Sequence, residues 1–187
     1  MKINTKKSCV LGLDISSSVV GICFLDSMDG NLIKLTHIEF PKKMKNLFDK
    51  TNFFKENFQK YLNEFEIKNF WIEESLQSFR SGFSSAQTLS MLAKINALIS
   101  YVVREACSIE PQFVSATSAR ATCGIKILSK KHGCLIPAKE QAFIWAIKGP
   151  LSNIVFPQKK TGKYKNYCFD QVDSFVIAKC GFLKMKH

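Results

Sequence analysis

Acidic side chains lie directly beside apolar runs at three separate places in the chain. A carboxylate at the end of a buried segment loses its hydration, which is costly unless a cation or a hydrogen-bond donor replaces the water. Hard divalent cations such as Mg²⁺ prefer carboxylate oxygens as ligands. The pattern therefore indicates a metal site assembled from distant parts of the sequence. The acids are Asp14 after the run 9–13, Glu73 after the run 70–72, and Asp170 and Asp173 before the run 175–178.

Carboxylates from several elements suit a site for two metal ions. Two ions ~3.5–4 Å apart share bridging oxygens, and one can activate water while the other stabilises the leaving oxygen of a phosphodiester. We therefore expect Mg²⁺ or Mn²⁺, as two ions, to be the cofactor. The histidines at 37, 132 and 187 are poorly placed to act as a general base, and a metal-dependent nuclease does not require one.

Each acid also has a purely structural interpretation. Asp14 precedes a serine-rich turn, where it would accept hydrogen bonds from local backbone N–H groups. Glu73 has Glu74 beside it, and only one of two strand neighbours can face a site; Glu73 is preferred because it directly follows the apolar run. Asp170 and Asp173 share one helix face, and in a first turn they would serve as an N-cap and a partner of the helix dipole. The four acids together are a more specific signal than any one of them.

The chain is strongly basic, with 27 Lys and Arg against 15 Asp and Glu, a formal charge of +12 and a pI near 9.4. This excess favours a polyanionic partner, although composition alone leaves basic proteins without a nucleic-acid role equally open. Acids clustered inside a basic surface are what a metal-dependent nuclease needs. No amphipathic helix has a concentrated Lys/Arg face, and no apolar run approaches the ~20 residues of a membrane span. We therefore expect no membrane partner.

Candidate DNA contacts form two groups. Residues 76–83 hold aromatic and basic side chains that follow Glu73 and would stack on bases, or pack into the core as Phe commonly does. Basic residues elsewhere are candidate phosphate contacts, with a solvated charged face as the alternative for any single lysine. The candidates are Leu76, Phe79, Arg80, Phe83, Arg120, Lys126, Lys130, Lys131, Lys159, Lys160, Lys163 and Lys165.

The elements that must position the acids follow from the hydrophobic periodicity. A meander of three strands precedes alternating helices and strands, which predicts an α/β fold with a mixed five-stranded sheet, its first three strands antiparallel and helices on both faces. We expect one domain over residues 1–187, with a mobile basic loop at 157–166. The predicted strands are 9–13, 19–25, 32–40, 69–73 and 112–115, and the predicted helices are 46–66, 84–106, 117–123, 138–148 and 171–183.

The seven cysteines contain no CxxC pair, which argues against a zinc knuckle. An odd number without a pairing pattern fits a reducing compartment, so we expect a cytoplasmic protein. The basic N-terminus is followed by only a short apolar run, unlike a signal peptide.

Four motifs resemble those of the RuvC family of Holliday-junction resolvases, within the RNase H-like superfamily. Their order and approximate intervals match over residues 9–180. The resemblance implies an RNase H-like fold that cuts branched DNA, and a homodimer, because a four-way junction has two-fold symmetry. The motifs are Leu11-Gly12-Leu13-Asp14 with Val20-Gly21, Phe70-Trp71-Ile72-Glu73, Ala138-Lys139-Glu140-Gln141, and Asp170-Gln171-Val172-Asp173.

The same resemblance assigns roles to individual residues. It implies that Asp14, Glu73, Asp170 and Asp173 are metal ligands, and that Lys139 is a charge partner near the scissile phosphate.

The sequence also departs from the family. Ile15-Ser16 stands where the family often has Pro-Gly, and the stretch after Glu73 and the loop 157–166 are enlarged. The segment 73–94 is most similar to phage-encoded members, so a phage or viral protein acting in its host is one expectation.

Three other functions share part of the pattern. A nuclease on RNA–DNA hybrids needs the same acids. A non-catalytic DNA-binding scaffold would not require all four acids. An actin-like ATPase or sugar kinase shares the strand–Asp–turn opening but uses Gly-rich phosphate loops, whereas serines occupy 16–18 here.

Overall fold

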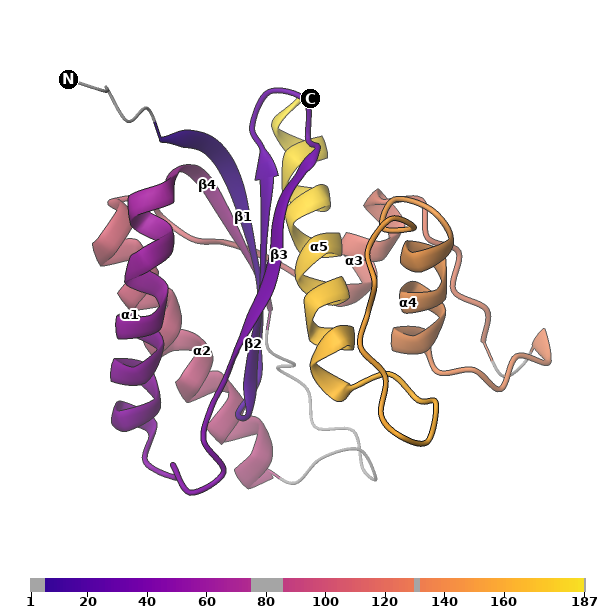
Figure 1. Ribbon diagram of the computed structural model, residues 1–187, viewed down its shortest axis with the longest axis horizontal. Coiled ribbons are helices and arrows are strands. Elements are labelled where there is room, and N and C mark those ends of the chain that lie inside the picture. Colours follow the sequence, from indigo (N-terminus) through magenta and orange to yellow (C-terminus); the bar gives the residue numbers. More distant parts are fainter. Residues whose placement is uncertain (1–5, 75–85, 130–131, 187) are drawn as a thin grey trace.

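A central sheet with helices on both faces forms the structure, a computed structural model that describes residues 6–74, 86–129 and 132–186 (Figure 1). In chain order the elements are β1 (Lys7–Ile15), β2 (Val19–Asp26), β3 (Leu32–Glu39), α1 (Leu47–Glu64), β4 (Phe65–Glu73), α2 (Ala86–Cys107), β5 (Gln112–Val114), α3 (Ala116–Thr122), α4 (Ala138–Lys148) and α5 (Asn166–Met185).

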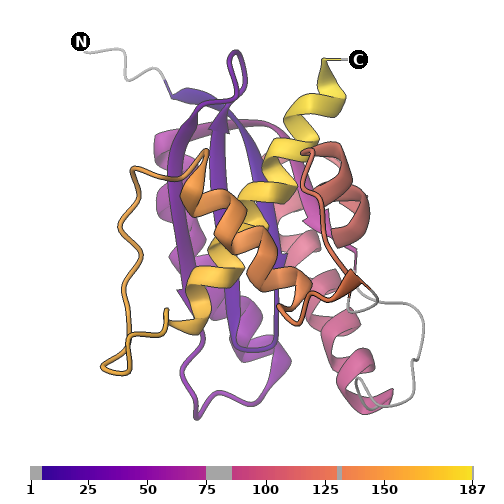
Figure 2. The same cartoon turned by 90° about the vertical axis from the view of Figure 1, so that its right-hand side faces the viewer.

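The sheet has five strands in the order β3-β2-β1-β4-β5. The first three strands are antiparallel, while β4 runs parallel to β1 and β5 parallel to β4. Helices α1 and α2 cover one face, and α5 covers the other with α3 and α4 packed on its outer side (Figures 1 and 2). The predicted mixed α/β sheet is confirmed.

Strand β1 is buried on both faces, and its side chains alternate between two cores. Leu11 and Leu13 pack with α1 and α2, whereas Val10 packs in the core on the α5 side. By the period of two along a strand, Gly12 and Asp14 also face α5. The apolar strand therefore delivers a carboxylate to the α5 side of the sheet.

Two glycines let α5 approach the sheet closely. A Cβ at Gly12 would lie 2.3 Å from the Ser174 carbonyl oxygen, and a Cβ at Gly21 would lie 2.1 Å from the Asp170 carbonyl oxygen. Gly21 pairs with Asp14 across β1 and β2. The absence of a side chain at position 21 thus brings the backbone of Asp170 directly over the carboxyl end of β1.

Helix α5 begins at Asn166, earlier than the predicted residue 171. Asp170 and Asp173 consequently lie beyond its first turn, so their interpretation as an N-cap and a first-turn dipole partner is wrong. Cys168 is fully buried and packs in the α5-side core. The helix therefore includes the turn before Asp170, because that turn is buried. The capping preference of Asp170, a local property, does not predict this burial.

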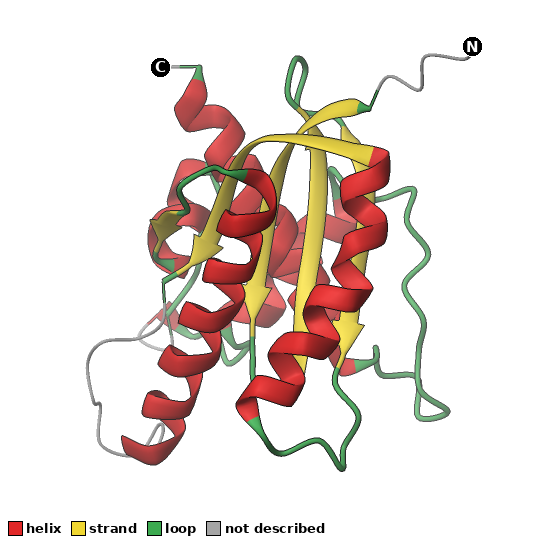
Figure 3. Ribbon diagram, turned by 90° about the vertical axis from the view of Figure 1, so that its left-hand side faces the viewer, coloured by secondary structure: helices red, strands yellow, loops and turns green. Residues whose placement is uncertain are grey.

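Helix α2 is long and apolar enough to cross a membrane by length and composition. In the fold it lies beside α1 on one face of the sheet (Figure 3). Ile95, Ile99 and Val103 are fully buried in that core. One side of α2 therefore packs on the core, while 28% of its apolar 18-residue window is buried.

Candidate metal centre

Parallel strands bring the first two acids together. Leu13 of β1 pairs with Ile72 of β4 in parallel register, so Asp14 and Glu73 end up side by side at the same edge of the sheet. Trp71 packs in the α5-side core, and Glu73, two residues later, faces the same side. Glu74 is exposed. The preference for Glu73 over Glu74 therefore agrees with the geometry.

Helix α5 supplies the third carboxylate. Ligand oxygens of Asp14, Glu73 and Asp173 all lie within 4.8 Å of one another. Asp173 is buried, with 4% of its surface exposed, and Asp14 with 9%. Asp170 is outside this group of three but lies one helical turn before Asp173, on the same face.

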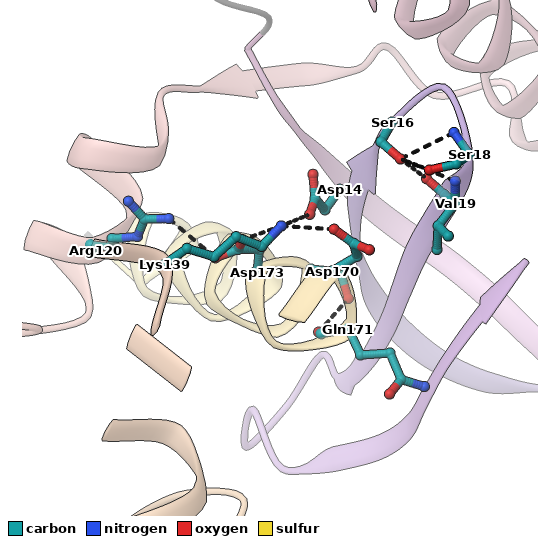
Figure 4. Close-up of polar contacts among 10 residues, drawn as sticks. Asp14, Ser16, Ser18, Val19, Arg120, Lys139, Asp170, Gln171 and Asp173 are labelled. Atoms are coloured by element: carbon teal, nitrogen blue, oxygen red, sulfur yellow. Dashed lines mark hydrogen bonds and ion pairs between the residues drawn. The ribbon is translucent and has the colours of Figure 1, made fainter. Parts of the chain in front are cut away.

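Lys139 of α4 links the acids across the site. Its Nζ lies 2.7 Å from Asp170 Oδ1, 3.0 Å from Asp173 Oδ2 and 3.5 Å from Asp14 Oδ2 (Figure 4). A single ammonium thus occupies the space between three carboxylates.

Arg120 of α3 contacts the carboxylate oxygen of Asp173 that Lys139 does not contact. Its Nη2 lies 3.2 Å from Asp173 Oδ1 (Figure 4). The guanidinium is largely buried, and its Nε has no hydrogen-bond partner in the described part of the chain. The sequence suggested only a phosphate contact for Arg120; its place just after β5, the neighbour of β4, was the available signal for a role at the site.

Burial dominates the electrostatics of the carboxylates. Burial raises the pKa of Asp14 well above its usual value against the opposing charge of Lys139, and the neighbouring acids raise it further. Burial, then the charge of Asp173, raises the pKa of Glu73 to about 7, while Lys139 and Arg120 oppose the shift. The pKa of Lys139 is raised because Asp14, Asp173 and Asp170 outweigh its own burial. Without further positive charge, the site disfavours full ionisation of its acids.

The donor set fits a divalent cation. Asp14 Oδ2 is buried and makes no hydrogen bond in the described residues, although Lys139 Nζ is 3.5 Å away. Within residues 6–74, 86–129 and 132–186, the four carboxylates face two cationic side chains, those of Lys139 and Arg120. An orphaned carboxylate oxygen and an excess of negative charge are the features that a hard cation satisfies.

The predicted phosphate contacts other than Arg120 are exposed wherever the structure describes them. Lys126 and the lysines of the loop 157–166 are exposed. Gln158 and Tyr164 form an antiparallel bridge within that loop, and Tyr164 packs on Phe143. The remaining candidates lie outside the described residues: Leu76, Phe79, Arg80, Phe83, Lys130 and Lys131.

A polar link between β3 and α5 was not anticipated from the sequence. The His37 ring stacks on Tyr167 with centroids 3.8 Å apart. Gln171 Nε2 lies 3.2 Å from His37 Nδ1, and burial lowers the pKa of His37. Gln171 stands between the two acids of α5, so this link steadies the helix that carries them.

The comparisons with solved structures identify the fold. Over 96% of this chain and 95% of the other, it is similar to Thermus thermophilus RuvC in complex with a Holliday junction substrate, with a TM-score of 0.65 and 12% identity. A second T. thermophilus RuvC structure gives a TM-score of 0.62 at 13% identity, covering 95% of each chain. The yeast mitochondrial Holliday junction resolvase Ydc2 gives 0.57 at 16% identity, covering 96% of this chain and 82% of that one. Models of protein families and curated protein sequences give no match. The fold is that of the RuvC resolvases, as the resemblance implied.

Proposed function

We propose that this protein is a metal-dependent endonuclease that cuts branched DNA, with the four-way junction as its substrate. The observation that carries the proposal is the convergence of Asp14, Glu73 and Asp173 within 4.8 Å. This cluster lies in a fold shared with resolvases over nearly the whole chain. The strongly basic composition supports a polyanionic substrate.

Asp14, Glu73, Asp170 and Asp173 would hold the divalent cations, Mg²⁺ or Mn²⁺, as two ions. Bound divalent cations supply an acidified water and charge neutralisation at the phosphate. Binding removes the electrostatic cost of ionising Asp14 and Glu73, whose pKa values burial raises. In-line attack by water would leave 5′-phosphate and 3′-hydroxyl ends.

Lys139 and Arg120 would act beside the cations. Carboxylates that bind a cation no longer need the Lys139 ammonium, which lies between three of them. The ammonium is then free to contact a nonbridging phosphate oxygen. Arg120 holds Asp173 at 3.2 Å and thereby fixes the direction of that carboxylate.

A nicking assay on labelled four-way, three-way, flap, linear duplex and RNA–DNA hybrid substrates tests the proposal, with Mg²⁺ or Mn²⁺ and with EDTA. We expect metal-dependent nicks that favour the four-way junction. Preference for the hybrid would instead support the RNase H-type alternative. Absence of cleavage on every substrate with both metals would overturn the proposal.

We further propose that the protein acts as a homodimer, because two symmetric nicks are needed to resolve a four-way junction. Helix α2 supports this because Met91 and Tyr101 are exposed on its outer side, at 36% and 60% of their surface. Light scattering at micromolar concentration should give twice the 21.2 kDa chain mass. A monomer would contradict the dimer without contradicting nuclease activity.

The proposed setting is the interior of a cell, including a phage-infected host. The odd number of cysteines, seven without a CxxC pair, fits a reducing compartment.

A further inference from the structure

A cavity of about 780 Å³ lies beside the carboxylate site. It is formed by the turn after β1, the segment between β3 and α1, and the start of α5. Ser17 in its wall follows Asp14 by three residues, and Tyr167 precedes Asp170 by three. Extended backbone advances at most ~3.6 Å per residue, so the cavity wall begins within about 11 Å of Asp14. A strand bound at the carboxylate site is therefore within reach of the cavity.

The lining is strongly basic. Five lysines face a single acidic residue, Glu39. None of the five makes an ion pair with a carboxylate among the described residues, in contrast to Lys34 and Lys68 elsewhere on the surface. The lysines are Lys42, Lys45, Lys50, Lys159 and Lys165.

Two of the five ammonium groups are held in place by polar contacts that do not neutralise their charge. Lys50 Nζ donates a hydrogen bond to the Ser17 carbonyl oxygen. Lys159 Nζ donates to Asn166 Oδ1 at 2.8 Å. Burial and the nearby charge of Lys45 lower the pKa of Lys50. Ammonium groups gathered in this way attract an anion that can meet several of them at once.

We infer that this basic cavity binds the phosphodiester backbone of the DNA strand next to the cleavage point. The inference rests on the proposed nuclease function and adds a second contact region to it. Lysine is a flexible point charge that contacts phosphate without reading bases. The Tyr167 ring is already stacked on His37, so it does not offer a free platform for a base. At about 3.4 Å of axial rise per nucleotide, the near wall of the cavity lies within roughly three nucleotides of the nick.

Removing two of these charges tests the inference. Lys42 and Lys45 are exposed, so the double variant Lys42→Gln/Lys45→Gln should fold normally, as thermal unfolding would verify. The matched control is Lys55→Gln/Lys60→Gln, which removes the same charge from exposed positions further along α1. Binding of a fluorescent four-way junction is measured by anisotropy over a range of salt concentrations, with Ca²⁺ replacing Mg²⁺.

The cavity variant should show a shallower dependence of log K on log salt, by about 0.9 for each phosphate that the protein no longer neutralises. The control should keep the wild-type slope. Neutral methylphosphonate linkages can replace the phosphates of the DNA strand near the nick. This replacement should weaken binding of the wild type more than binding of the cavity variant, which has already lost two of the lysines. Equal slopes for the two double variants, in a protein that binds and cuts junctions, would overturn the cavity inference alone. Failure of the wild type to bind or cut any DNA would overturn the proposed function as well.

Discussion

At the scale of single residues, the site is a balance between buried acids and two basic side chains. Burial disfavours the ionised forms of Asp14 and Glu73, and both side chains therefore have raised pKa values. In the described part of the chain, Lys139 and Arg120 supply part of the positive charge that would balance these acids. The residues are therefore poised for cation binding, and their protonation should report it.

Changing Asp14 to Asn should abolish cleavage while preserving junction binding. The amide cannot supply the anionic oxygen to a metal, and loss of negative charge lowers repulsion of phosphate. We expect a fall in cleavage rate on the order of 10³-fold or more, as for other single catalytic groups. Asp29→Asn is the matched control, since Asp29 lies in the turn between β2 and β3 and its hydrogen bonds to described residues stay within that turn. Loss of binding together with cleavage would indicate a folding role for Asp14.

The stability of the metal-free protein should depend on Glu73. Its pKa is raised from 4.5 to about 7, so the folded state binds more protons than the unfolded chain between these values. The free energy of unfolding contributed by Glu73 therefore falls as pH rises through this window. Thermal unfolding in EDTA should show this fall, and Glu73→Gln should make it shallower, with Asp14, whose pKa is also raised, contributing the rest. If stability falls with pH equally in the wild type and in Glu73→Gln, the raised pKa does not belong to Glu73.

Divalent metal should reverse the loss of stability at neutral pH. A cation binds the ionised acids, so Mg²⁺ or Mn²⁺ should raise Tm more near neutral pH than in acid. A free metal concentration of 100 times the Kd raises the free energy of unfolding by about 2.7 kcal/mol. For a chain of this size that corresponds to a rise of roughly 5–10 °C in Tm. The Glu73→Gln protein serves as the control and should respond less. An equal metal effect in both proteins would argue against Glu73 as a ligand.

At the scale of elements, the distance between α5 and the sheet determines whether the acids of α5 reach those of the strands. Helix α5 packs on β1 and β2 at Gly12 and Gly21, where any Cβ would collide with its backbone. Asp170 and Asp173 therefore reach Asp14 only because these two strand positions carry no side chain.

Gly12→Ala should push α5 away from the sheet. Its Cβ would come within 2.3 Å of the Ser174 carbonyl oxygen and 2.5 Å of the Ala178 amide nitrogen. Overpacking of this kind costs about 1–3 kcal/mol, and metal affinity should fall with it as Asp173 moves. Gly149→Ala is the milder comparison, because its Cβ would meet one atom, the Trp145 carbonyl oxygen, at a tight 3.2 Å, and Gly149 lies at the end of α4 opposite Lys139. Thermal unfolding with and without metal measures both effects, and unchanged metal affinity in Gly12→Ala would contradict this role of α5.

At the scale of the whole molecule, a net charge of +12 surrounds a cluster of acids. Under the proposed function, attraction of the DNA backbone and retention of metal would fall to different parts of the surface. The two requirements do not conflict, because the acids are largely buried whereas Lys126 and the lysines of the loop 157–166 are exposed.

Junction binding should consequently weaken steeply with salt. A protein that makes about 6–10 phosphate contacts loses roughly 10³–10⁵ in affinity between about 50 and 200 mM salt. Anisotropy titrations of the wild type would measure this slope. A flat response would show that the basic surface does not contact the DNA backbone.

Much of this protein can be read from local pattern. The buried strand before Asp14, the apolar run before Glu73 and the spacing of Asp170 and Asp173 each depend on neighbouring residues. The fold class and the order of elements were therefore predictable, and so was the proximity of Asp14, Glu73 and Asp173. Only the tertiary structure decided the early start of α5, the ion pair of Arg120 with Asp173, and the gathering of Lys42, Lys45 and Lys50 with the later loop. These features arise from packing between segments far apart in the chain, which no local periodicity encodes.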